Sequence, residues 1–518
     1  MHWVIIETGA NQSFVFAATK RRANVGASQL IHELGTSWAR EASRDLSGVE
    51  LVVEASGKAI ALVADPSIGR SLVRRVTRRA LREAPGLEVW GAVDAQALAP
   101  DLSDAGLGLA RAHRVHAAAR QALPSPAERH RSGPFLEPCA YTSGAATALA
   151  PEVRGAPARP RSATFDATFR AGSTEALDRL RSLVPPGSGA VLGDLSTDVS
   201  NAGWVAVVHA DGNGIGQAFL TLHEVVEGRR FVDTLRDFSR ALDQIGRAAL
   251  ASAVEQVGPS AGEGWLLPLV VGGDDLTVLL DSRVALEFTA AYLREFEATA
   301  RAHPSVQEMA ELGALPDAAL TAAAGIAYVK PHHPFHDAYE LAEQLCASAK
   351  QLPDGSAARS ALDARVVFDS VGRRLAQVRA ESVVRSSDGQ DALRLWAGPV
   401  VVPPEDRTGE VHRGPTCERD IVHLRRGVAE VRAGRANAPV SSAALHALRE
   451  DLTHGGERIR ARRESVEQRS RDAGVARLFL DRHVEVTDEE GVRFSRLIDL
   501  LALAEVHRGA RSVDGVSA

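Results

Sequence analysis

The sequence predicts an α+β protein with two ferredoxin-like domains followed by a mainly helical C-terminal domain. Short apolar runs and amphipathic helical patterns alternate in the order β-α-β-β-α-β over residues 1–115, and the same order recurs at greater length over residues 185–375. Residues 376–518 carry mostly helical patterns. Between the two units, residues 116–184 should form a linker and irregular segment, because residues 120–165 are rich in Pro, Ala, Arg and Ser and 155–161 read as a loop.

The first unit has apolar runs of strand length, two helical patterns and a Ser56-Gly57 turn that predicts a hairpin. Its expected strands are residues 3–6, 51–53, 60–63 and 87–90, with residues 14–16 continuing or pairing with the first strand. Its expected helices are residues 26–41 and 71–83, the second of them basic.

The second unit follows the same plan. Its expected strands are residues 204–208, 266–271, 276–280, 322–329 and 366–368. Its expected helices are residues 231–249, 285–302 and 336–350, and the first shows apolar residues at alternating spacings of four and three. In the C-terminal part, Ser441 and Ser442 should cap a helix, and residues 478–480 and 497–501 should form the core. Nothing in this part predicts catalysis.

Composition and charge restrict the function classes. The chain has 518 residues, 45% hydrophobic and 24% charged, which is ordinary for a protein of several globular domains. A net charge of -6 does not favour nucleic-acid binding as the main role, and the basic run at 458–463 is better explained as a solvated helix face. Three distant cysteines match neither a disulfide framework nor a zinc site. With no signal-peptide pattern and no long apolar run, we expect a cytoplasmic protein that does not enter a membrane.

A glycine-rich turn follows the first strand of the second unit and opens with Asp211. The turn reads Asp211-Gly212-Asn213-Gly214-Ile215-Gly216. Its glycines allow backbone N–H groups at the start of a helix to approach a phosphate chain. Taken alone, such a strand-to-helix turn is more often only a tight turn.

A second acidic motif lies in the hairpin of the same unit. It reads Gly272-Gly273-Asp274-Asp275, and its adjacent carboxylates repel each other between two apolar strands. In a β-α-β-β unit, the end of the first strand lies near the tip of the following hairpin, so Asp211, Asp274 and Asp275 should converge. Three carboxylates suit Mg²⁺ or Mn²⁺, and we expect two such ions there. The alternative is a turn with solvated acids.

The two motifs together resemble the palm domain of nucleotidyl cyclases and polymerases. GGDEF-type diguanylate cyclases are one branch, but the pattern is more similar to the large polymerase/cyclase subunit of type III CRISPR effector complexes, which carries Gly-Gly-Asp-Asp itself. Further features of that family occur here in order, namely the strand at 324–327, Pro331 and Pro334, Ala349-Lys350, and residues 360–363. The resemblance covers most of residues 200–370.

The first unit resembles the degenerate first palm of the same family, through Glu7-Thr8, Gln12 and residues 24–28. Ser56 and Lys58 stand where the second unit has its acidic turn, so the first palm should bind no metal. An acceptor nucleotide should lie between the two palms, held by polar groups such as Ser56 or Asn24. The rival arrangement is a homodimer in which two active palms meet.

The sequence also departs from the family. No histidine–aspartate nuclease motif occurs near the start, and the histidines at 332–336 are better explained as an exposed loop. The zinc-binding cysteines are missing, with residues 139–142 as a possible remnant, and Asn213 stands where aspartate is common. The resemblance therefore implies a compact relative.

The function that this resemblance implies is the synthesis of a cyclic oligonucleotide or dinucleotide from ATP or another NTP, in antiviral defence. Asp211, Asp274 and Asp275 would be catalytic and hold the metals. The residues from Gly212 to Gly216, together with Gly272 and Gly273, would bind the nucleotide, and Lys350 would reach the triphosphate or be only a surface lysine. Possible partners are RNA and effector-complex subunits. The alternatives are a template-dependent polymerase, a diguanylate cyclase, and a non-catalytic scaffold that binds nucleotide or RNA.

Overall fold

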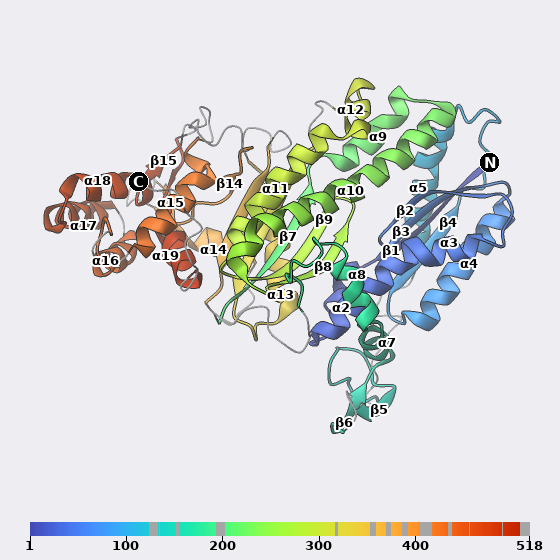
Figure 1. The fold of residues 1–518 in the computed structure, drawn as a ribbon, viewed down its shortest axis with the longest axis horizontal. Coiled ribbons are helices and arrows are strands. Elements are labelled where there is room, and N and C mark those ends of the chain that lie inside the picture. The colour runs from blue at the N-terminus through green and yellow to red at the C-terminus, as the bar shows by residue number, and fades with distance from the viewer. Residues whose placement is uncertain are drawn as a thin grey trace.

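The computed structural model shows a mixed α+β protein with several sheets (Figure 1). The first sheet lies at one end, a larger sheet in the middle, and the C-terminal helices at the other end. One continuous apolar core joins the first two regions. The structure describes residues 1–123, 133, 135–151, 155–192, 203–315, 320–352, 359–368, 374–385, 392–404, 417–433, 438–454, 456–488 and 491–507.

The first sheet contains four antiparallel strands in the order β2-β3-β1-β4. Its strands are β1 (His2–Gly9), β2 (Val49–Ala55), β3 (Lys58–Val63) and β4 (Glu88–Val93). Its helices are α2 (Arg21–Glu33), η1 (Leu34–Trp38), α3 (Ala39–Ser43), α4 (Pro66–Glu83) and α5 (Ala105–Gln121). The expected hairpin at Ser56-Gly57 is present, and Gly57 has a positive φ of 73° that a turn of this kind requires.

One expected strand of the first unit is wrong. Residues 14–16 belong to or follow the short helix α1 (Asn11–Val15), which begins after Ala10 in a left-handed conformation. Phe16 packs against Tyr339, with ring centroids 4.4 Å apart. An apolar run of three residues is too short to reveal its period, and here its burial depends on contact with a distant helix.

The second sheet contains six strands in the order β14-β11-β10-β7-β9-β8. Its strands are β7 (Val205–Gly212), β8 (Leu266–Gly272), β9 (Asp275–Asp281), β10 (Ala322–Val329), β11 (Ala361–Val366) and β14 (Val400–Val401). Its helices are α9 (Ile215–Val225), α10 (Gly228–Ala261), α11 (Ala285–Ala302), α12 (Pro304–Glu311) and α13 (Phe335–Ala349). The long helices α10 and α11 lie side by side (Figure 1).

The last strand expected in this unit is displaced. Residues 366–368 were expected to form it, but β11 ends at Val366 and Phe368 is 66% exposed. The strand instead includes Asp363, which is buried because the Ser348 hydroxyl and the Arg379 guanidinium donate hydrogen bonds to its carboxylate. Such distant partners allow a polar segment to become a buried strand.

The segment between the units is more regular than expected. Within it, β5 (Ala148–Pro151) and β6 (Ala158–Arg161) form a two-stranded hairpin, followed by α7 (Ala163–Ala171) and α8 (Thr174–Arg181). Pro160 is tolerated because both strands of such a ribbon are edge strands. Helix α7 packs closely on α2: a Cβ on Gly26 would lie 1.8 Å from the Thr168 carbonyl oxygen.

The C-terminal part is mostly helical, with a small sheet of order β12-β13-β16-β15. Its helices are α14 (Leu375–Glu381), α15 (Ile421–Arg432), α16 (Ser442–Leu452), α17 (Gly456–Arg469), α18 (Ala473–His483) and α19 (Leu497–Val506). Its strands are β12 (Val383–Arg385), β13 (Ala392–Arg394), β15 (Val486–Thr487) and β16 (Arg493–Phe494).

Two details of the C-terminal prediction need correction. Ser441 caps α16 by accepting a hydrogen bond from the Ala444 N–H group, whereas Ser442 is the first helical residue. Leu478 is 55% exposed, although the neighbouring Phe479 belongs to the core. Among the described residues, no helix is long and apolar enough to cross a membrane.

Candidate active site

The two acidic motifs meet at one end of the second sheet. Asp211 is the penultimate residue of β7, and this strand pairs with β9, which begins at Asp275. The Gly273 φ of 62° lets the chain turn between β8 and β9. A Cβ on Gly212 would lie 2.9 Å from the Cβ of Asp274, so only glycine allows the strand end and the hairpin tip to come this close. The expected convergence of the motifs is therefore present.

The carboxylates at this place repel one another. Desolvation by the surrounding protein and the negative charge of Asp211 raise the pKa of Asp274 to about 6. Asp275 opens towards solvent, but desolvation by the protein around it, followed by repulsion from Asp211 and Asp274, raises its pKa well above the usual range. The three carboxylates therefore resist being ionised together unless a positive charge lies beside them.

Lys350 supplies the compensating positive charge. Its ammonium group, just beyond the end of α13, forms an ion pair with the Asp211 carboxylate and donates a hydrogen bond of 3.1 Å to the Gly212 carbonyl oxygen. Both side chains of the pair are about one-third exposed. One ammonium beside three carboxylates leaves an excess of negative charge, and this donor set of hard oxygens fits Mg²⁺ or Mn²⁺. In the described part of the chain, however, no group of three or more acidic, His or Cys side chains is already arranged to hold a metal ion.

The glycine-rich turn leads into α9 as expected. Gly214 adopts a left-handed conformation with φ 72°, and the space beside Gly214 and Gly216 is open. The Asn213 side chain is buried and donates a hydrogen bond of 2.9 Å to the Thr321 hydroxyl. Ile215 is also buried. These two side chains therefore shape the turn, and from Gly212 to Gly216 it is the backbone groups that are available to a ligand.

A cavity of about 440 Å³ lies between the first and second units and reaches Asp275. Its lining residues from the second unit are His209, Val270, Gly272, Asp275, Thr277 and Tyr339. Those from the first unit and α5 are Thr8, Gly9, Ala10, Asn11, Gln12, Val15, Phe16, Ser28, Ile31, Ser56 and Arg120. We refer to this cavity as the interdomain pocket.

Direct contacts hold the two sides of the interdomain pocket together. The Ser28 hydroxyl donates a hydrogen bond to the Leu269 carbonyl oxygen, and the Gln12 amide donates one of 3.1 Å to Glu343. A Cβ on Gly272 would lie 3.1 Å from the Cβ of Ser56, so the two hairpin tips nearly touch. The pocket is consequently a feature of one chain.

Sequence reasoning missed several of the lining residues. His209 and Asp211 are two positions apart on β7 and so share one face of the sheet, a period that could have pointed to His209. Its Nδ1 lies 3.2 Å from the Thr277 hydroxyl, and burial lowers the pKa of His209 to about 4. No sequence signal could have found Tyr339, which reaches the pocket from α13.

Other polar residues of the first unit have structural roles. Asn24 was expected to help to hold an acceptor, but its buried amide donates hydrogen bonds to the carbonyl oxygens of Val15 and Ala18. Glu7 lies 3.7 Å from the Lys58 ammonium and 3.8 Å from His116. Ser56 alone of the two expected acceptor groups lines the pocket.

This geometry, with carboxylates at a strand end and a hairpin tip, is the arrangement expected of a palm domain. The family model described as Cas10/Cmr2, second palm domain, matches residues 204–357. No curated protein sequence matches the chain.

Solved structures of Csm1 share the fold across nearly the whole chain. Csm1 in T. onnurineus is 14% identical with a TM-score of 0.54, and the match covers 98% of this chain and 70% of that one. A Csm1–Csm4 cassette in complex with pppApA is 13% identical with a TM-score of 0.52, covering 98% of this chain and 69% of that one. A Csm1–Csm4 cassette in complex with AMPPNP is 13% identical with a TM-score of 0.51, covering 98% and 70%. Residues 204–357 thus match a Cas10/Cmr2 second palm domain, and the resemblance to the large subunit of type III CRISPR effector complexes is confirmed.

Proposed function

We propose that this protein is a metal-dependent nucleotidyltransferase that makes a cyclic oligonucleotide, with release of pyrophosphate. The observation that carries the proposal is the meeting of Asp211, Asp274 and Asp275, the last of which lines the interdomain pocket. The adenine nucleotides in the Csm1–Csm4 structures favour ATP as the substrate. A role in antiviral defence, within an effector complex, is part of the same proposal.

We infer that the chain divides into a degenerate first palm (residues 1–115), a connecting segment (116–184), a catalytic second palm (185–375) and a mainly helical domain (376–518). Both palms would have the ferredoxin-like topology. The strand orders β2-β3-β1-β4 and β10-β7-β9-β8 support this inference, since each places the first and third strands of its unit in the middle of the sheet.

The donor nucleotide would lie at the second palm. Asp211, Asp274 and Asp275 would hold up to two Mg²⁺ or Mn²⁺ ions, which when bound would lower the pKa of the attacking hydroxyl and neutralise charge on pyrophosphate. Backbone N–H groups at the start of α9, near Gly214 and Gly216, would donate to the phosphates. Lys350 would exchange its bond to Asp211 for one to the triphosphate.

The acceptor nucleotide would occupy the interdomain pocket. The side-chain oxygen of Asn11 is buried there and has no hydrogen-bond partner among the described residues, so it can accept a bond from the ligand. Ser56 offers a hydroxyl from the facing hairpin tip. An acceptor held by these groups lies beside the donor, which the reaction requires.

The non-catalytic alternative is weaker than the sequence suggested. It depended on Asn213 as a lost metal ligand, but the Asn213 amide is bonded to Thr321 and serves the turn. The three carboxylates are retained.

The test is to incubate the pure protein with Mn²⁺ and each NTP separately, and to measure pyrophosphate and cyclic products. The Asp274→Ala/Asp275→Ala variant should lose product formation. A matched variant, Asp237→Ala/Asp243→Ala, removes two carboxylates from the surface of α10 and should keep it. Unchanged turnover by a folded Asp274→Ala/Asp275→Ala protein would show that these carboxylates are not catalytic.

A further inference from the structure

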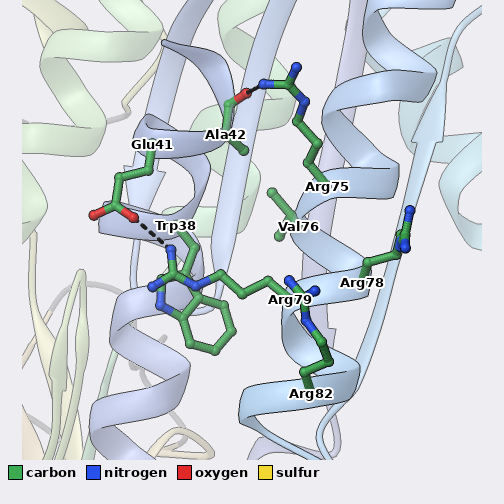
Figure 2. Close-up of a pocket in the computed structure, with 8 residues that line it drawn as sticks. All are labelled: Trp38, Glu41, Ala42, Arg75, Val76, Arg78, Arg79 and Arg82. Atoms are coloured by element: carbon green, nitrogen blue, oxygen red, sulfur yellow. Dashed lines mark hydrogen bonds and ion pairs between the residues drawn. The ribbon is translucent and has the colours of Figure 1, made fainter. Parts of the chain in front are cut away.

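A groove lined by arginines lies on the first unit, between η1–α3 and α4. Its cavity volume is about 430 Å³. It is lined by Trp38, Glu41, Ala42, Arg75, Val76, Arg78, Arg79 and Arg82 (Figure 2). We refer to these residues as the basic groove. The basic groove shares no lining residue with the interdomain pocket, so it is a separate surface.

The charge on α4 is unusually one-sided. The helix contains six arginines and a single acid, Glu83, in a chain whose net charge is -6. Four of the arginines recur every fourth residue, at positions 70, 74, 78 and 82, and all four are exposed. Like charges at this spacing repel each other along a helix. In the described part of the chain none of these four forms an ion pair, and only Arg70 has an acidic neighbour, Asp65, whose pKa its charge helps to lower.

The two remaining arginines fix the wall of the groove. Arg75 donates a hydrogen bond of 3.1 Å to the Ala42 carbonyl oxygen. The Arg79 guanidinium lies over the Trp38 ring, 4.8 Å from its centre, and bonds to Glu41 at 2.6 Å. Figure 2 shows Arg78 and Arg82 extending from α4 without such partners. The groove thus has a fixed inner side, and on its outer side the Arg78 and Arg82 guanidinium groups form no ion pair with any described residue.

We propose that the basic groove binds the phosphate backbone of single-stranded RNA. Guanidinium groups match phosphate oxygens in pairs. The exposed arginines of α4 continue beyond the groove to Arg70, so that the row from Arg70 to Arg82 is about 18 Å long, which several nucleotides can follow. Glu41 is 48% exposed at its side chain and can accept a hydrogen bond from a ribose 2′-hydroxyl, which DNA lacks.

An acidic polypeptide fits the groove less well. Tight protein contacts need an apolar anchor that enters a pocket. Here the apolar floor is closed, because Trp38 and Val76 are each only 1% exposed. The accessible surface offers charge and hydrogen bonds, which are what a sugar-phosphate backbone uses.

The experiment measures fluorescence anisotropy of a short, labelled single-stranded RNA of mixed sequence, without NTP or metal. It compares the wild type with Arg78→Glu/Arg82→Glu. The control, Arg471→Glu/Arg477→Glu, makes the same change of net charge at exposed arginines around α18. Loss of two phosphate contacts should weaken binding at least about 25-fold at about 0.1 M salt and lower the salt slope by about 1.4. The control should bind as the wild type does.

Two further variants separate a lost contact from a lost fold. Arg78→Lys/Arg82→Lys should retain the salt slope, and Arg78→Gln/Arg82→Gln should lose affinity without a change of thermal midpoint, since both side chains are exposed. The proposal is overturned if RNA does not bind the wild type, or if the glutamate variant and its control bind RNA equally. It is also overturned if DNA of the same sequence, or polyglutamate, competes as well as RNA. The readout is independent of nucleotidyl transfer.

Discussion

Replacing Lys350 with glutamine should change metal binding and nucleotide use in opposite directions. In the structure its ammonium group neutralises the Asp211 carboxylate and so competes with any cation that needs the same oxygens. Two unit charges about 4 Å apart in water interact by about 1 kcal/mol, and a divalent ion doubles this repulsion. Because the pair is about one-third exposed, salt with a Debye length of about 8 Å reduces the repulsion to about 1 kcal/mol. Lys350→Gln should therefore bind Mn²⁺ about fivefold to tenfold more tightly.

The same variant should lose ATP affinity and turnover, because the point charge for the triphosphate is gone. Its free energy of unfolding should change by less than about 1 kcal/mol, as for other partly exposed ion pairs. Titration calorimetry with Mn²⁺ and steady-state kinetics with ATP measure the two effects. The matched control is Lys330→Gln. The Lys330 ammonium lies over the ring of Trp204, the residue that directly precedes β7. Unchanged or weaker Mn²⁺ binding in Lys350→Gln would show that Lys350 does not compete with metal at Asp211.

Three more outcomes follow from the site. Gly212→Ala should lower activity at least tenfold and the free energy of unfolding by about 1–3 kcal/mol, because the new Cβ would meet Asp274. Gly216→Ala, where a Cβ has open space, should change neither quantity. Product assays and urea unfolding measure the two effects. His209 is neutral when folded, so the unfolded chain takes up more protons below pH 6.5, and stability should fall by up to about 3 kcal/mol as pH drops towards 4. Between pH 7 and pH 5, His209→Asn should lose less free energy of unfolding than the wild type does, as measured by urea unfolding. An equal loss in the two proteins would refute this reasoning. Specific activity should not change on dilution if one chain holds both nucleotides; a fall in proportion to concentration would favour a homodimer.

The sequence predicted the parts of the fold that local pattern determines. Strands β7, β8 and β9 are long apolar runs, and Gly272-Gly273 marks the turn between the last two, so both motifs and their meeting could be read directly. The helix α1 was missed because three apolar residues have no measurable period. Strand β11 was displaced because the burial of Asp363 depends on Arg379, a partner that no local pattern reveals.

The interdomain pocket could be anticipated but not built from the sequence. Two repeated units with one acidic tip suggested that a ligand lies between them. The wall formed by Phe16 and Tyr339, however, joins residues more than three hundred positions apart, and their 4.4 Å contact arises only from tertiary packing. Asn24 was misassigned for a similar reason. Its amide donates hydrogen bonds to the carbonyl oxygens of Val15 and Ala18, which lie close to it because residues 11–15 form a helix and not the expected strand.

The asymmetry between the two units has a physical reason in the way they meet. The tip of the first hairpin lies against the tip of the second, where a Cβ on Gly272 would be 3.1 Å from Ser56. Carboxylates on both tips would add to a cluster in which Asp274 and Asp275 already have raised pKa values. In the first unit Glu7 is instead paired with Lys58, and the tip offers a neutral hydroxyl. Once the tips touch, only one of them can remain acidic, and under the proposed function the other tip would contact the acceptor nucleotide without a metal.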